Sequence, residues 1–253
     1  MGGRTKSIAL LFSVSLVLTG CVTTDGQPFN ENRAVVDYMN LSVGYLEAGY
    51  TARAVKPLER ALEIEPDSAS VHGLLGVVFQ RQGEDRLAEQ SFNRALAIDS
   101  DASDIRNNFG AFLLSRNRLE EAYRQFELAS QDVSYARRNR IFENMGRVAL
   151  RLDKPSLAAE NFTRALRLNS NLPRANLELA AIYKDEGDLH KAWQYYQAFD
   201  VASGQNARSL LLGIDLATAN GAQSKVASYA MQLERLYPGS AELKQYRSRL
   251  GYE

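Results

Sequence analysis

The stretch NNFGAFLLSRNRLEEAYRQFELASQD, residues 107–132, indicates the fold of this chain. It contains two apolar-periodic segments, 107–115 and 119–130, separated by a short polar connection. Apolar side chains spaced three and four residues apart predict amphipathic helices. Gly110 and Ala122 are small enough to let two antiparallel helices approach closely, and Phe109 and Phe126 are large enough to fill the space between them. The stretch therefore predicts a helical hairpin.

The same arrangement recurs in windows of about 34 residues, which begin at positions 35, 69, 103, 139, 173 and 207. A two-residue insertion near VSYARR separates the third and fourth windows. This period, with its small and aromatic positions, is typical of tetratricopeptide repeats. The pairs Leu41-Ser42, Leu75-Gly76, Phe109-Gly110, Met145-Gly146, Leu179-Ala180 and Leu212-Gly213 align at positions seven and eight, and Ala54, Ala88, Ala122, Ala158, Ala192 and Val226 align at position twenty.

These repeats predict an all-α fold, a right-handed solenoid of six helix-turn-helix repeats with a C-terminal capping helix. Gly49, Gly83, Gly187 and Gly221 share position fifteen, where the turn between helices favours a positive φ. The expected organisation is a signal peptide (1–20), a lipidated tether (21–34), repeats at 35–68, 69–102, 103–138, 139–172, 173–206 and 207–240, and a cap at 241–253.

The N-terminal segment VLTGCVTT, residues 17–24, contains the single cysteine of the chain. It follows Arg4, Lys6 and an apolar run, which is the pattern of a secretory signal. LTGC resembles the bacterial lipobox, in which the peptide is cut before the cysteine and the sulfur is acylated. We therefore expect Cys21 to be lipidated, against the alternative of an ordinary buried cysteine. The absence of Asp after this cysteine favours an outer-membrane lipoprotein that faces the periplasm.

Composition argues against several classes of protein. Thirty basic and thirty acidic residues give no net charge, whereas nucleic-acid binders are markedly basic. His72 and His190 lie in different windows without spaced carboxylates, so we expect no metal site. No glycine-rich phosphate loop follows a strand pattern. We expect no enzyme, cofactor or small-molecule substrate.

The first helices of a binding solenoid line its concave surface, here at positions two, five, nine, twelve and thirteen. In the first window these positions hold Val36, Met39, Val43 and Leu46, which predicts an exposed apolar stripe for a partner protein. The alternative is that the tether covers this stripe, through Phe29 for example.

Further along the same face, Gln80 and Asn107 predict a polar stretch suited to a peptide backbone. Arg140, Arg147 and Arg174 then predict a cationic stretch, which extends to Lys184 and could steer an acidic segment. The alternative is a solvated helix face whose charges are neutralised by nearby Glu and Asp.

Three segments contain residues that the repeat consensus does not require: FENMG (142–146), QNARSLLLGI (205–214) and LYPGS (236–240). These segments resemble the type IV pilus biogenesis lipoproteins that act as pilotins of the outer-membrane secretin. The resemblance covers nearly the whole chain. It implies a lipid-anchored protein whose partner is the secretin and which promotes secretin localisation, insertion or multimerisation. The alternative is a general envelope scaffold for outer-membrane barrels or cell-wall machinery.

Overall fold

The computed structural model describes residues 31–202 and 204–251. The expected signal peptide, Cys21 and Phe29 lie outside these residues. Within the described ranges all regular elements are helical, so the predicted all-α repeat fold is confirmed. The helices are α1 (Glu31–Glu47), η1 (Thr51–Ala54), α2 (Val55–Ile64), α3 (Ala69–Gln82), α4 (Asp85–Ile98), α5 (Ser103–Ser115), α6 (Leu119–Ser130), α7 (Arg138–Arg151), α8 (Pro155–Leu168), α9 (Pro173–Asp185), α10 (Leu189–Ala202), α11 (Ala207–Ala219), α12 (Gln223–Leu236) and α13 (Ala241–Arg249).

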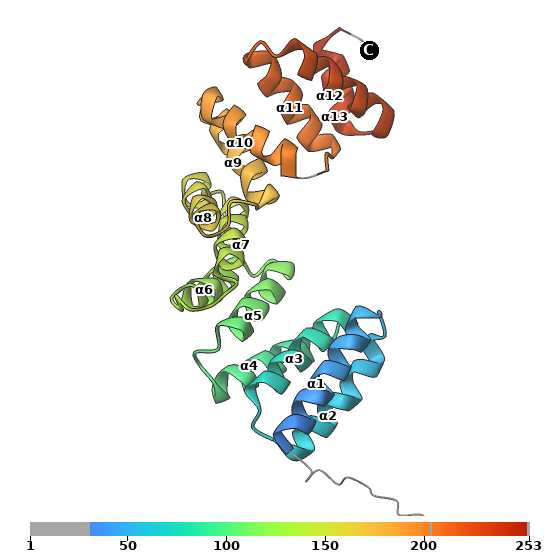
Figure 1. Cartoon of the computed structure of the whole chain (residues 1–253), viewed down its shortest axis with the longest axis vertical. Helices are drawn as coiled ribbons and strands as arrows, with labels where there is room; N and C mark the ends of the chain where they lie inside the picture. The colour runs from blue at the N-terminus through green and yellow to red at the C-terminus, as the bar shows by residue number, and fades with distance from the viewer. Residues whose placement is uncertain (1–30, 203, 252–253) are drawn as a thin grey trace, which may run out of the picture.

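Successive helices pair as antiparallel hairpins, and the hairpins stack into a curved array that runs from α1 to α13 (Figure 1). The two-residue insertion lies in the connection between α6 and α7, residues 131–137. None of the helices in the described part of the chain combines the length and the apolar character needed to cross a membrane.

The turn inside each repeat has the same backbone geometry. Position fifteen has a positive φ in all six repeats, including the two in which it is not glycine. There Asn117 (φ 61°) and Asp153 (φ 57°) adopt the left-handed conformation, which short polar side chains tolerate better than other residues do. The 34-residue spacing therefore places the same backbone turn in every repeat.

Close approach of the two helices in a repeat depends on position eight. A Cβ atom on Gly76, Gly110 or Gly146 would lie 2.7–2.8 Å from the aromatic ring at position twenty-four of the same repeat. In the first repeat Ser42 takes this place, and its hydroxyl donates a 2.8 Å hydrogen bond to the carbonyl oxygen of Ala54. Large residues at position twenty-four are thus accommodated by small residues at position eight.

The sixth repeat departs from this rule, and the predicted alignment of Leu212-Gly213 with positions seven and eight is wrong by one residue. A Cβ atom on Gly213 would collide with Tyr196 of the preceding repeat. Position eight is instead Ile214, which is buried, while position twenty-four is the small residue Ala230. In this repeat the large residue of the pair therefore lies on the first helix, α11, and the small residue lies on the second, α12.

The hydrophobic core forms three clusters along the array. The central cluster extends from Ala88 to Ile182, and smaller clusters lie at the N-terminal and C-terminal ends. Half-buried Val77 and Phe79 pack against both the N-terminal and central clusters. Tyr183 and Tyr195 pack against both the central and C-terminal clusters, and their rings stack with centroids 5.6 Å apart.

Candidate partner-binding groove

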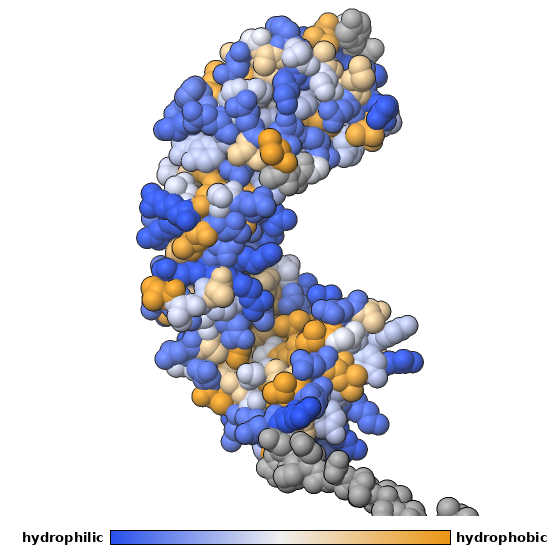
Figure 2. All heavy atoms as spheres, in the orientation of Figure 1, coloured by the Kyte–Doolittle hydropathy of each residue, from blue (hydrophilic) through white to orange (hydrophobic). Residues whose placement is uncertain are grey.

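One side of the array is hollowed, and its surface chemistry changes along its length (Figure 2). Apolar residues gather on this side over the N-terminal half, whereas hydrophilic residues cover most of its middle. The residues predicted for the groove therefore have apolar surroundings at its N-terminal end and polar surroundings in its middle.

The first repeat presents an apolar stripe that is shorter than predicted. Val36 and Val43 on α1 are 53% and 38% exposed, and Met39 between them is half-buried. Leu46 is only 7% exposed, so its assignment to the exposed stripe is wrong. It belongs to the core cluster that joins the first two repeats, together with Val78 of α3. We define the apolar stripe as Val36, Met39 and Val43.

The polar middle of the groove contains a hydrogen-bonded chain between two helices. Asn144 Nδ2 donates to Asn107 Oδ1 at 3.4 Å, and Arg147 Nη1 donates to Asn144 Oδ1 at 3.1 Å. Arg151, one turn further along α7, donates to the carbonyl oxygen of Leu114 at 2.8 Å. Asn107 and Arg147 are thus linked through Asn144, whereas Gln80 lies half-buried on α3, outside this chain of contacts.

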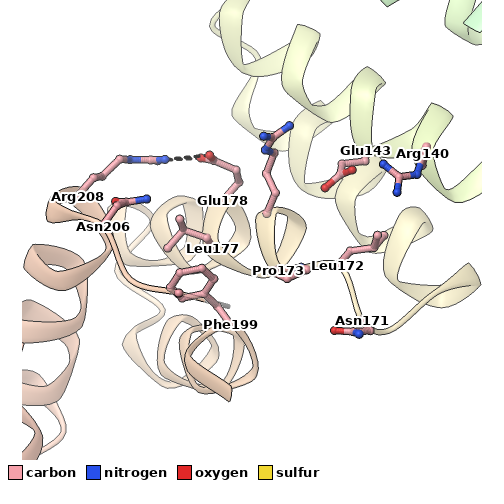
Figure 3. Close-up of a pocket in the computed structure, with 12 residues that line it drawn as sticks. Arg140, Glu143, Asn171, Leu172, Pro173, Leu177, Glu178, Phe199, Asn206 and Arg208 are labelled. Carbon is pink, nitrogen blue, oxygen red and sulfur yellow. Dashed lines mark hydrogen bonds and ion pairs between the residues drawn. The ribbon is translucent and has the colours of Figure 1, made fainter. Parts of the chain in front are cut away.

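Two of the predicted arginines, Arg140 and Arg174, line one hollow of about 590 Å³. In Figure 3, Arg140 and Glu143 extend from α7, while Leu177 and Glu178 extend from α9. The loops before α9 and α11, the ring of Phe199 and the start of α11 complete its wall. We call this cavity the basic hollow. Its lining is Arg140, Glu143, Asn171, Leu172, Pro173, Arg174, Leu177, Glu178, Phe199, Gly204, Asn206 and Arg208.

Charge in the basic hollow is unevenly compensated. Arg208 forms two hydrogen bonds of 2.8 Å to the two carboxylate oxygens of Glu178. Arg147 is half-buried beside this region, and its burial together with the positive charge of Arg174 holds its pKa below the usual value for arginine. A guanidinium remains charged in proteins, so Arg147 keeps its positive charge despite its burial and its proximity to Arg174.

Several residues of the basic hollow were missed at the sequence level. Leu172, Leu177 and Phe199 are buried and form its apolar floor. Arg208 could have been found, because it occupies position two of its window, as do Arg140 and Arg174 in theirs. Phe199 could not, since it belongs to the second helix of its repeat.

The groove offers apolar surface at one end and guanidinium hydrogen-bond donors at the other. Among residues 31–202 and 204–251, no three His, Cys, Asp or Glu side chains lie close enough to hold a metal ion.

Comparison with known proteins identifies a curated relative that covers 96% of the chain. A tetratricopeptide-repeat family model matches residues 40–104 and 144–207. The type IV pilus assembly protein PilF of Pseudomonas aeruginosa is 45% identical over 249 residues, which cover 96% of this chain and 99% of the relative.

Solved structures show the same relationship. A Pseudomonas aeruginosa PilF structure superposes with a TM-score of 0.84 at 46% identity, covering 87% of this chain and 99% of that one. The crystal structure of PilW, described as a widely conserved type IV pilus biogenesis factor, has a TM-score of 0.72 at 28% identity, covering 85% and 99%.

Proposed function

Because the chain belongs to the tetratricopeptide-repeat family of type IV pilus assembly proteins, we propose that it is the pilotin of the outer-membrane secretin through which the pilus leaves the cell. The observation that carries the proposal is the 45% identity to a pilus assembly protein over 99% of that relative's length. A match of this extent spans all six repeats and both ends of the array. Its part in type IV pilus biogenesis follows from the family.

In this role the N-terminal segment determines where in the cell the protein is held. Acylation of Cys21 would anchor the protein in the outer membrane, since two or more acyl chains hold a protein stably in a bilayer. The repeats would then project into the periplasm, where secretin subunits arrive. The protein acts by binding and does not catalyse a reaction.

The apolar stripe of the first repeat is the proposed contact with the secretin. Val36, Met39 and Val43 lie at spacings of three and four on α1, so they share one helix face. Exposed apolar surface of this kind usually marks an interaction site. Burial of one such side chain against a partner contributes about 1.5–3 kcal/mol.

Met39→Glu tests this contact. The glutamate would be solvated in the free protein but would lose its hydration when the secretin binds, which is costly for an unpaired charge. We expect normal circular dichroism and normal membrane fractionation, with loss of secretin multimers on gels. Met231→Glu is the matched control, because Met231 is 67% exposed on α12, at the other end of the array. Wild-type multimer levels in a folded, membrane-bound Met39→Glu variant would refute the contact.

Cys21→Ser tests the anchor. We expect loss of palmitate labelling and of fractionation with the outer membrane, while the repeats fold as before. Equal labelling of the variant and the wild-type protein would refute lipidation at Cys21. Pull-down from membranes separates a secretin-specific pilotin from a general envelope scaffold, which would instead recover many barrels or cell-wall enzymes.

A further inference from the structure

The basic hollow contains guanidinium groups that the described protein does not neutralise. Arg140 and Arg174 are exposed, and neither has an ion pair with a side chain in residues 31–202 or 204–251. Arg147 donates only to the neutral amide oxygen of Asn144 in the same ranges. Arg140 and Arg174 in the hollow, with Arg147 beside it, thus present hydrogen-bond donors from which no carboxylate of the described chain accepts.

Nearby cations on the same face differ. Lys184 lies 2.6 Å from Asp215, Arg249 lies 2.5 Å from the other oxygen of Asp215, and Arg208 is paired with Glu178. Among the described residues, the arginines on this face that lack a carboxylate partner are therefore Arg140 and Arg174 in the hollow, together with Arg147 and Arg151 beside it on α7. Glu143 is the carboxylate of the hollow that remains available to oppose their positive charge, since both oxygens of Glu178 already accept hydrogen bonds from Arg208. This finding goes against the alternative that the whole cationic stretch is neutralised locally.

The apolar floor restricts the ligand. Leu172, Leu177 and Phe199 line the hollow at 7%, 6% and 3% exposure. A nucleic acid or a lipid phosphate would use the arginines but would leave this floor uncovered, and a dense polyanion would meet Glu143. An extended peptide satisfies both requirements, because successive side chains can alternate between a carboxylate and an apolar group. The volume of about 590 Å³ is within the range of peptide- and ligand-sized sites.

We propose that the basic hollow binds an extended acidic peptide segment of a protein partner, whose carboxylates bond to Arg140 and Arg174 and whose apolar side chains pack against Leu177 and Phe199. The partner's role in pilus assembly rests on the proposed function. The peptide chemistry rests on the hollow alone. The site lies on the fourth to sixth repeats, whereas the apolar stripe lies on the first, so one extended partner could use both.

The experiment is a titration of the full-length chain in detergent with a fluorescent peptide that alternates Leu and Glu. A peptide with Gln in place of every Glu is compared with it. We expect binding of the Glu peptide only, with affinity that falls as salt rises. Arg174→Gln should weaken binding about tenfold, as should Arg140→Gln, since each removes a charged hydrogen bond to the peptide. Glu143→Gln should tighten binding, because it removes the opposing carboxylate.

Arg167→Gln is the matched control. Arg167 is an exposed arginine of the fourth repeat with the same charge, but it lines a different cavity, with Thr163 and Tyr183. We expect the Arg167→Gln variant to bind the Glu peptide with the same affinity as the wild-type protein. Equal binding of the Glu and Gln peptides, or equal loss in Arg167→Gln and Arg174→Gln, would overturn the proposal. So would full competition by inorganic phosphate or by phosphatidylglycerol in mixed micelles, which would identify a phosphate site. Because this titration contains no secretin, its outcome is independent of the Met39→Glu experiment.

Discussion

Gly110→Ala places a methyl group where the two helices of the third repeat are in contact. The added Cβ atom would lie 2.8 Å from one ring atom of Phe126 and 3.0 Å from two others. The optimal carbon–carbon separation is about 3.5–4.0 Å, so three contacts would each be too short by about 0.5 Å or more. Phe126 is fully buried, which prevents its ring from moving into solvent.

Two opposing effects set the magnitude. Replacing a helical glycine with alanine stabilises a helix by about 0.5–1 kcal/mol. Overpacking a core costs about 1–3 kcal/mol. We therefore expect Gly110→Ala to lower the free energy of unfolding by about 1 kcal/mol. Gly44→Ala is the matched control, since its Cβ atom would have nothing within 4 Å and only the stabilising effect remains.

The assay is urea unfolding of the full-length chain, followed by circular dichroism at 222 nm, for Gly110→Ala, Gly44→Ala, Phe126→Leu and the double variant Gly110→Ala/Phe126→Leu. Leucine already occupies position twenty-four in the first repeat, opposite Ser42, so the smaller side chain should accept a Cβ atom at position eight. We expect a coupling free energy of about 1–2 kcal/mol between the two substitutions. Additive effects, or stabilisation by Gly110→Ala comparable to that of Gly44→Ala, would refute the packing argument.

Ala122→Leu should destabilise the protein by about 1–3 kcal/mol, because position twenty is fully buried between the helices, and an unchanged urea midpoint would contradict the repeat register. Gly187→Ala should cost about 1 kcal/mol through backbone strain alone, since φ is 83° and the added methyl group meets no atom within 4 Å; the urea midpoint reports it. Burial of Asp200 disfavours its charged form, but hydrogen bonds from Lys225, Tyr229 and Gln205 outweigh this and hold its pKa below the usual value. Stability from this group should therefore be complete above pH of about 4 and lost as pH falls through the lowered pKa, and Asp200→Asn should flatten the acid side of a Tm-against-pH curve.

The repeat architecture could be predicted from the sequence because the packing of the two helices in a repeat depends on a few positions that hold either very small or very large residues. A glycine opposite an aromatic ring allows the two helices of a repeat to pack in one way, as at Gly76, Gly110 and Gly146. Position fifteen adopts the same turn even where it holds Asn117 or Asp153. The sixth repeat was misaligned because Ile214 and Ala230 exchange the large and small positions, and a pattern search expects the glycine at position eight.

The groove was harder to predict, because exposure depends on the neighbouring repeat as well as on the position number. Leu46 has the right spacing for the apolar stripe, but α3 packs over it. Arg140, Arg147 and Arg174 were found from their positions alone. Which cations are neutralised could not be read from the sequence, since Lys184 and Arg249 share Asp215 across more than thirty residues of chain.

The division of the core into three clusters has a mechanical consequence. The N-terminal and central clusters meet at Val77 and Phe79 of α3, and the central and C-terminal clusters meet at the stacked Tyr183 and Tyr195. The continuous helices α3 and α9 each contact two clusters, so neither boundary falls in a loop. The apolar stripe lies on the N-terminal cluster, whereas the basic hollow takes Leu172 from the central cluster and Leu177 and Phe199 from the C-terminal cluster. A partner bound at both sites would therefore bridge all three clusters and fix the spacing between the first repeat and the fourth to sixth.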